Sequence, residues 1–140
     1  MSKYHAVFAF TPFCKVDAMP MAPALLKGIC DNHGLKTTTV DLNIETQIAY
    51  KDHPYKTEIE KYLMFFTEMP DEAYDWYQKY INETARRLVE IDAGWIGFSL
   101  LSFQSLCFTH DICFAVKKLK PEQKIMIGGP GISKDDNINR

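Results

Sequence analysis

The feature of this sequence that most constrains its fold is the alternation of short apolar runs with longer amphipathic segments. Residues 5–10 and 95–101 are almost continuously apolar, residues 124–127 form a shorter run of the same kind, and residues 36–41 are rich in β-branched side chains. Such runs are typical of strands that are buried on both faces of a sheet. Strands that alternate with helices imply a parallel sheet with right-handed crossovers. The sequence therefore predicts a doubly wound α/β fold with a parallel sheet of about four strands.

The segments between the runs carry apolar side chains at helical spacing and predict the crossover helices. The first helix is expected to begin at residue 20 or 23 and to end near residue 32, where Gly34 can adopt the left-handed cap conformation. A later helix is expected over residues 103–119. The first helix places its apolar side chains on one face, namely Leu25, Leu26, Ile29 and Cys30.

The region 43–92 is predicted to be an aromatic helical insert between the second and third strands. Residues 43–54 are expected to form a loop, and helices are expected over 54–67 and 71–91. The eight aromatic side chains from Tyr55 to Tyr80 exceed what one crossover helix requires. A helical hairpin that packs on the sheet and on itself is the favoured interpretation. A lid or docking surface is the alternative.

The chain is expected to form one α/β domain over residues 1–140, with a polar tail at 133–140. It stops shortly after the fourth predicted strand, where folds of this kind usually add another helix and a fifth strand. We therefore expect a fragment or a shortened domain that is truncated before a fifth strand. The fourth strand would then leave an open sheet edge, through which a homodimer could form.

Composition excludes several classes of partner. The net charge is −2 and no basic block is present, so neither nucleic acid nor a membrane surface is an expected partner. The four cysteines show no CxxC spacing, which favours free thiols in a reducing cytoplasm. The sequence contains no P-loop, no GxGxxG motif and no recognisable nucleophile–base pair, so no catalytic residues are predicted. The histidines are interpreted as structural side chains, and Asp111 is interpreted as a solvated one.

A ligand site is predicted where the strands end. In open α/β sheets, ligands bind in the crevice outside the carboxyl ends of the strands. Glycines after a strand let a ligand approach the backbone, and hydroxyl and amide side chains can bind a polar or phosphate-bearing group. The candidate cofactor-binding residues at these ends are Thr11, Pro12, Phe13, Asp41, Asn43, Ser99, Leu101, Ser102, Gln104, Gly128, Gly129, Pro130 and Gly131.

Two of these segments resemble the core of cobalamin-binding domains. The first is residues 95–102 (WIGFSLLS), and the second, after a helix, is residues 125–130 (IMIGGP). The opening of the chain resembles the version of this domain that precedes a radical SAM domain, through residues 20–23 (PMAP), Gly34 and residues 40–43 (VDLN). The chain is thus similar to the N-terminal cobalamin (B12)-binding domain of B12-dependent radical SAM enzymes.

The resemblance implies specific roles for four residues. Ser99 and Leu101 match the SxL element of the family, and Gly128 and Gly129 match its GG element. In the family these elements line the slot for the dimethylbenzimidazole tail of cobalamin. The loop of residues 11–21 would then lie under or beside the corrin ring.

The sequence departs from related domains in two respects. Methionine-synthase-like domains carry a cobalt-binding histidine in a DxHxxG motif after the first strand, whereas the loop here has none. Bound cobalt would therefore lack a histidine ligand. The chain also lacks the CxxxCxxC spacing that holds an iron–sulfur cluster. The resemblance thus implies that the cluster and S-adenosylmethionine belong to a radical SAM catalytic domain, either beyond Arg140 or on another chain.

Two other functions remain open at this point. The chain could be a truncated or degenerate domain that binds a protein partner and no cofactor. It could also be a flavodoxin-like module that binds a flavin or another nucleotide at the same strand ends. Visible absorption would distinguish the three, because cobalamin is red to orange, flavin is yellow and an empty domain is colourless.

Overall fold

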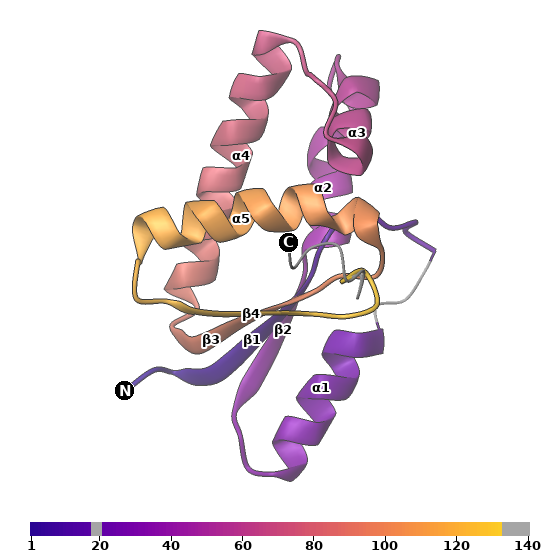
Figure 1. The fold of residues 1–140 in the computed structure, drawn as a ribbon. Helices are drawn as coiled ribbons and strands as arrows, with labels where there is room; N and C mark the ends of the chain where they lie inside the picture. The colour runs from indigo at the N-terminus through magenta and orange to yellow at the C-terminus, as the bar shows by residue number, and fades with distance from the viewer. Residues whose placement is uncertain (18–20, 133–140) are drawn as a thin grey trace, which may run out of the picture.

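The computed structural model describes residues 1–17 and 21–132, which form a parallel sheet of four strands. The strands follow the order β2-β1-β3-β4 across the sheet. They agree within two residues with the four predicted runs, and the doubly wound α/β fold is confirmed (Figure 1). The strands are β1 (Tyr4–Phe10), β2 (Thr37–Asp41), β3 (Ala93–Ser99) and β4 (Lys124–Gly128).

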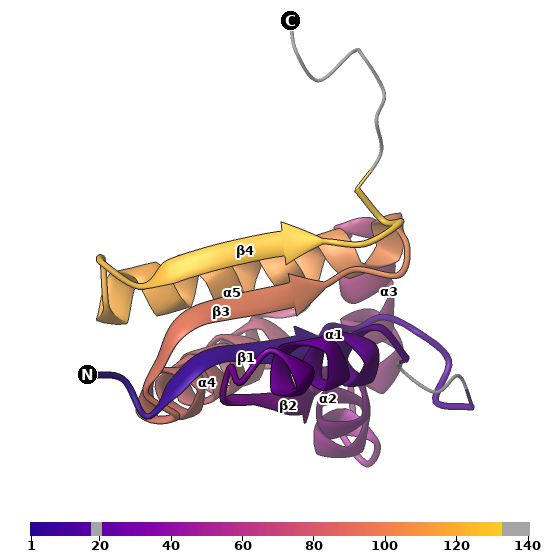
Figure 2. The ribbon, with the colours of Figure 1, turned by 90° about the horizontal axis from the view of Figure 1, so that it is seen from below.

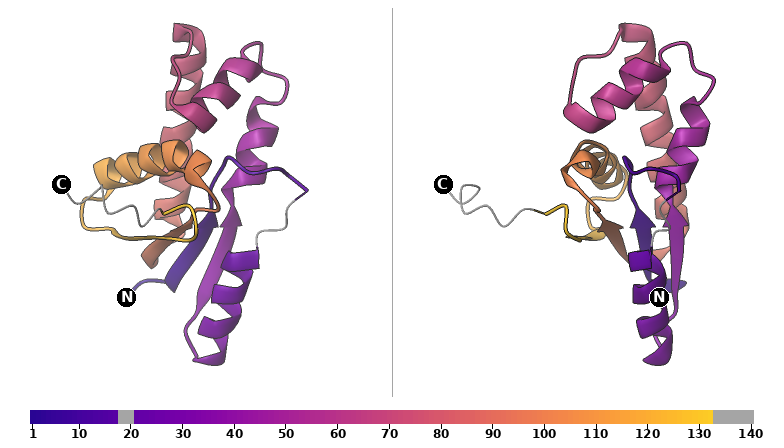
Figure 3. Two further views of the ribbon diagram at one scale, coloured as in Figure 1. Left: turned by 45° about the vertical axis from the view of Figure 1, so that its right-hand side comes forward. Right: turned by 90° about the vertical axis from the view of Figure 1, so that its right-hand side faces the viewer.

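Helices lie on both faces of this sheet. On one face lies α1, and on the opposite face lie α4 and α5, with α3 packed against α5 (Figures 1 and 3). No helix of residues 1–17 and 21–132 has the length and the apolar character that crossing a membrane requires. The helices are α1 (Met21–Asn32), α2 (Leu42–Tyr50), α3 (Lys56–Phe65), α4 (Asp71–Glu90) and α5 (Leu106–Leu119), and a 3-10 turn, η1 (Phe103–Ser105), precedes α5.

The prediction of a loop over residues 43–54 is wrong, because α2 occupies most of that segment. The helix begins directly after β2, where Asp41 Oδ1 accepts a hydrogen bond of 3.0 Å from the backbone N–H of Ile44. This side chain satisfies one of the unpaired N–H groups at the start of the helix. Leu42 and Tyr50 anchor α2 because both are buried. The two later helices of the insert, α3 and α4, were correctly predicted.

The hydrophobic core lies between the sheet and the α4–α5 layer. Alternate side chains of β1 and β3 point into it, including Val7 and Ile96, because successive residues of a strand face opposite sides. From the helices, Tyr77, Phe108 and Ile112 fill the opposing surface and are fully buried. This layer holds most of the buried apolar area and fixes the positions of the strand ends.

The opposite face of the sheet is only half covered. Figure 2 shows α1 in front of β1 and β2, whereas no helix of the described residues lies in front of β3 and β4. Pro23 is the only buried residue of α1. The apolar face predicted for this helix is therefore largely exposed, with 65% of Leu25 and 48% of Ile29 accessible to solvent.

Candidate ligand site at the carboxyl ends of the strands

The chain topology creates a crevice between β1 and β3. These adjacent strands lead into α1 and α5, which lie on opposite faces of the sheet. A crevice at such a switch point is where open α/β sheets bind ligands. The register pairs Phe10 with both Asp41 and Ser99, and Ser99 with Gly128. All four strands therefore end at the same level.

A hollow of about 390 Å³ opens beside this edge, on the face that carries α1. Its floor includes Gly97 and Ser99 of β3 and Gly128 at the end of β4. The walls are mainly apolar, and the Ser99 hydroxyl group is the main polar contribution among the side chains. A flat, mostly apolar group with one hydrogen-bonding atom suits this chemistry. The remaining lining residues are Phe8, Ala22, Leu25, Leu26, Phe98, Met126, Ile127 and Gly129.

The three glycines at and after the end of β4 have different physical roles. A Cβ atom on Gly129 would collide with the backbone of Leu100, and the φ of Gly129 is +113°, a conformation that favours glycine. A Cβ atom on Gly131 would lie 2.5 Å from the carbonyl oxygen of Ser102. These two glycines therefore let the loops after β3 and β4 pack together. A Cβ atom on Gly128 would meet nothing within 4 Å, so this position stays open beside the hollow.

Backbone hydrogen bonds hold the two loops together. The N–H of Leu100 donates to the carbonyl oxygen of Gly128 at 2.9 Å, and the N–H of Gly131 donates to the carbonyl oxygen of Leu100 at 3.1 Å. The predicted Ser99–Ser102 and Gly128–Gly131 segments thus form one packed unit.

Thr11, the first predicted site residue after β1, has a structural role. Its hydroxyl and its N–H both donate to the carbonyl oxygen of Ser99, at 3.2 and 3.4 Å. The hydroxyl also accepts a hydrogen bond of 3.0 Å from Thr109 on α5. The Thr11 side chain is fully buried, so it joins β1, β3 and α5 and does not face the hollow.

The next residues of this loop are held by α2 and η1. The N–H of Cys14 donates to Asn43 Oδ1 at 2.9 Å, and Gln47 Nε2 donates to the carbonyl oxygen of Cys14 at 2.7 Å. The N–H of Phe13 donates to the carbonyl oxygen of Gln104 at 3.3 Å. Burial raises the pKa of the Cys14 thiol, and the nearby carboxylates of Asp17 and Asp41 add to the rise. Asn43 is therefore a buried support for the loop.

The other predicted residues lie around the crevice but outside the hollow. Asp41 caps α2, Pro12 is buried, and Ser102 is half-buried immediately before η1. Leu101 and Pro130 are exposed. Of the thirteen predicted residues, the structure places Ser99, Gly128 and Gly129 at the hollow.

Sequence reasoning missed the residues that form the walls of the hollow. Phe8 and Met126 lie on the face of the sheet that carries α1, because they occupy the alternate positions of their strands, opposite to those that fill the core. Ala22 and Leu25 of α1 also line this hollow. They are three residues apart, so they lie on the same face of the helix. Successive side chains of a strand point to opposite faces of the sheet, and this alternation could have identified the residues on the α1 side.

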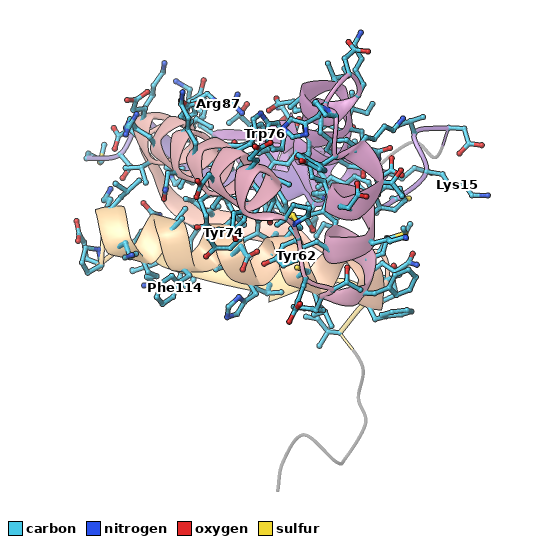
Figure 4. The ribbon with its side chains drawn as sticks, turned by 90° about the horizontal axis from the view of Figure 1, so that it is seen from above. Lys15, Tyr62, Tyr74, Trp76, Arg87 and Phe114 are labelled. Carbon is cyan, nitrogen blue, oxygen red and sulfur yellow. The ribbon has the colours of Figure 1, made fainter. Side chains whose placement is uncertain are left out.

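The interpretation of Asp111 as a solvated side chain is wrong. Its carboxyl oxygen Oδ2 accepts hydrogen bonds from Tyr62 Oη at 2.8 Å and from Tyr77 Oη at 3.0 Å. The other oxygen, Oδ1, lies 3.0 Å from Nδ1 of His110. Burial raises the pKa values of both tyrosines. The negative charge of Asp111, and the hydrogen bonds that the tyrosines donate to it, raise these pKa values further. In Figure 4, Tyr62 and Tyr74 lie between α4 and α5, where a polar hollow of about 310 Å³ adjoins Asp111.

No protein-family model matches the chain, and no curated protein or solved structure is significantly similar to it. Within the part of the chain that the structure describes, no three His, Cys, Asp or Glu side chains gather in a way that could hold a metal ion. The geometry of the described residues therefore carries the functional argument.

Proposed function

We propose that this chain is a cobalamin-binding module that serves a B12-dependent radical SAM enzyme of the methyltransferase type. The observation that carries the proposal is the hollow beside Ser99 and Gly128, at the switch point of the sheet. These are two of the residues through which the sequence resembles the cobalamin-binding family.

The shape and chemistry of the hollow fit the tail of cobalamin. Dimethylbenzimidazole is a flat, largely apolar ring system in which one nitrogen atom, when it is not bound to cobalt, accepts a hydrogen bond. Gly97 and Gly128 keep the floor free of side chains, and the Ser99 hydroxyl is available at the end of β3. Leu25 and Met126 offer apolar contacts to the faces of such a ring. When bound, cobalamin would supply the methyl-transfer or radical chemistry, while these residues would bind and orient it.

The proposed binding mode uses no histidine ligand from the loop after β1. Residues 11–17 contain no histidine, and two of the four histidines, His5 and His33, lie toward the amino ends of the strands. His53 packs against the ring of Trp76 at 4.9 Å between centroids, and His110 lies beside Asp111. In this proposal the chain holds the cofactor through its tail and its corrin edge.

The radical SAM chemistry is assigned to another domain or chain. The four cysteines at positions 14, 30, 107 and 113 lack the spacing that ligates an iron–sulfur cluster. An iron–sulfur cluster and S-adenosylmethionine would therefore be supplied by a radical SAM domain, in cis or in trans.

The proposal is tested by titrating the purified chain with hydroxocobalamin and recording its visible spectrum after desalting. We expect retained absorbance with a base-off band shape. Gly128→Leu should abolish retention, because its side chain enters open space and fills the hollow without a backbone clash. Gly28→Leu is the matched control, since Gly28 is an open glycine on α1 that does not line the hollow.

A colourless wild-type protein would contradict the proposal, and equal retention by Gly128→Leu would contradict the assigned slot. A colourless protein would instead favour the alternative of a truncated interaction module, which the exposed apolar side of α1 supports. A yellow protein would favour a flavin-binding module.

A further inference from the structure

A second hollow, of about 720 Å³, lies at the amino ends of the strands, on the face of the sheet that carries α1. The starts of β1, β2 and β3 line it, together with the end of α1 (Figure 2). Its volume lies in the range of small-molecule binding sites. Phe8 and Met126 also line the first hollow, beside Ser99, so the two hollows adjoin. We call the second one the amino-end hollow.

Three lysines make one end of the amino-end hollow cationic. The ammonium groups of Lys3 and Lys36 lie 5.5 and 5.0 Å from the centre of the Tyr4 ring. That of Lys124 lies 5.4 Å from the centre of the Trp95 ring. Within the described part of the chain, none of the ion pairs uses these lysines, and no aspartate or glutamate lines the hollow. This end therefore offers positive charges that lack a carboxylate partner.

The negative groups nearest to this end are already hydrogen-bonded. The last carbonyl oxygens of α1 accept hydrogen bonds from the N–H groups of residues 33–35, at 2.9 to 3.3 Å. The carboxyl oxygen Oδ2 of Asp92 accepts a hydrogen bond of 3.0 Å from the backbone N–H of Lys3. The lysines therefore dominate the charge that a ligand would meet.

The register of the strands separates this cationic end from an apolar body. Lys124 pairs with Trp95 at the start of β3 and β4. Met126 pairs with Gly97 two residues further along, which is roughly 7 Å at the rise of a strand. Trp95 and Met126 are 42% and 44% exposed, so both can contact a ligand. An amphipathic anion, with a charged head and an apolar chain, has the same polarity along its length.

A buried hydroxyl at the cationic end lacks a partner. Thr37 lines the amino-end hollow and is 5% exposed, and within the described part of the chain its Oγ1 has no hydrogen-bond partner. Thr37 pairs with Ala6, which lines the same hollow. An unpaired buried hydroxyl is unfavourable. A ligand oxygen that contacts Thr37 would accept this hydrogen bond.

We propose that the amino-end hollow binds a fatty acid. Its carboxylate lies among the three lysines, where charge-assisted hydrogen bonds form, and its chain lies over Trp95 toward Met126. This site is separate from the slot assigned to the cobalamin tail, and it does not depend on the proposed function.

The first test is isothermal titration calorimetry of the whole chain with decanoate. We expect saturable binding of one decanoate per chain. Decyltrimethylammonium has a chain of equal length and a positive head, so it should bind at least about tenfold more weakly. Acetate, which lacks the chain, should show no saturable binding. Absence of decanoate binding overturns the proposal, and so does equal binding of the two ten-carbon compounds, because apolar contact alone then explains the affinity.

Charge reversal at one lysine tests the cationic end. Lys36→Glu should weaken decanoate binding about tenfold. Lys118→Glu is the matched control, because it changes the net charge equally. The Lys118 ammonium group also lies over an aromatic ring, at 5.5 Å from the centre of Phe114, but on α5 (Figure 4). Far-ultraviolet circular dichroism verifies that both variants are folded. Equal affinities of the two variants overturn the proposal.

Two further variants locate the site. Trp76→Phe leaves Trp95 as the only tryptophan, and decanoate should shift its emission with the dissociation constant that calorimetry gives. Gly128→Leu fills the neighbouring hollow and should leave decanoate affinity unchanged. Unchanged Trp95 emission, or loss of decanoate binding in Gly128→Leu, places the ligand elsewhere and overturns the proposal. Because cobalamin retention has the opposite response to Gly128→Leu, either site can fail without the other.

Discussion

Tyr62 on α3 donates a hydrogen bond of 2.8 Å to the carboxyl group of Asp111 on α5, and these residues are 49 positions apart in the chain. Tyr77 on α4 donates to the same oxygen at 3.0 Å. One side chain therefore connects three helices of the layer that covers the core. Hydrogen bonds to an ionised carboxylate are stronger than those between neutral groups. Asp111 consequently fixes how the aromatic insert docks on α5.

Replacing Asp111 by asparagine should destabilise the fold. The shape is retained, but the two tyrosine hydroxyls lose a charged acceptor, and we expect a loss of about 1–3 kcal/mol in the free energy of unfolding. Urea denaturation followed by tyrosine and tryptophan fluorescence measures this loss. Asp52→Asn is the control, because the Asp52 side chain is 88% exposed and its change should be near zero. Equal stabilities of the two variants would contradict this role for Asp111.

Alkaline pH should destabilise the protein. Burial and the charge of Asp111 raise the pKa of the Cys107 thiol from 9.0 to about 12, and burial raises the pKa of Cys113 to about 11. Above about pH 9 the unfolded chain releases these protons while the folded chain retains them, so the free energy of unfolding falls as the pH rises. Urea midpoints measured from about pH 8 to about pH 11 test this expectation. The fall should be shallower in Cys107→Ala, and an unchanged slope would argue against a contribution from this thiol.

The two adjacent glycines at the end of β4, Gly128 and Gly129, should respond differently to alanine. Gly129→Ala places a Cβ atom against the Leu100 backbone at a φ of +113°, and we expect a loss of about 1–3 kcal/mol. Gly128→Ala meets no atom within 4 Å and should leave stability nearly unchanged. Thermal unfolding of the two variants gives a direct comparison. A larger loss at Gly128 would mean that the loops after β3 and β4 do not pack as described.

Removal of the Asn43 side chain should free the loop after β1. Asn43 Oδ1 accepts the N–H of Cys14 at 2.9 Å, and Gln47 Nε2 donates to the same Oδ1 at 2.9 Å. In Asn43→Ala, we expect faster hydrogen exchange at the amide of Cys14, with little change in the strands. Asn82→Ala on the exposed side of α4 is the control. Exchange at Cys14 that is equally fast in both variants would show that this contact does not hold the loop.

The fold could be predicted because its strands are continuous apolar runs with clear boundaries. The strands in residues 5–10 and 95–101 could be predicted without tertiary information, since a strand buried on both faces is apolar at nearly every position. The segment of α2 was missed for a local reason. The helix begins with Asp41 as its N-cap, but an aspartate in this position is equally compatible with a strand that ends in a loop.

Ser99 and Gly128 could be predicted as site residues because they are the last residues of two strands, and ligands bind at that end of a parallel sheet. The walls of the hollow depend on which face of the sheet α1 covers, and no local pattern specifies that choice. Asp111 was misjudged for a related reason, because its donors Tyr62 and Tyr77 are 49 and 34 residues away in the chain. Contacts of that sequence separation arise only when α3, α4 and α5 assemble.

The sparse anchoring of α1 divides the molecule into two cooperative units. Since Pro23 is the only buried residue of α1, we expect the helix to detach from β1 and β2 while the core under α4 and α5 stays closed. Amide protons of α1 should then exchange through a local opening of low free energy, whereas those of β1 and β3 exchange only on global unfolding. A molecule that binds to both α1 and the sheet would therefore couple the unfolding of α1 to the global unfolding of the protein.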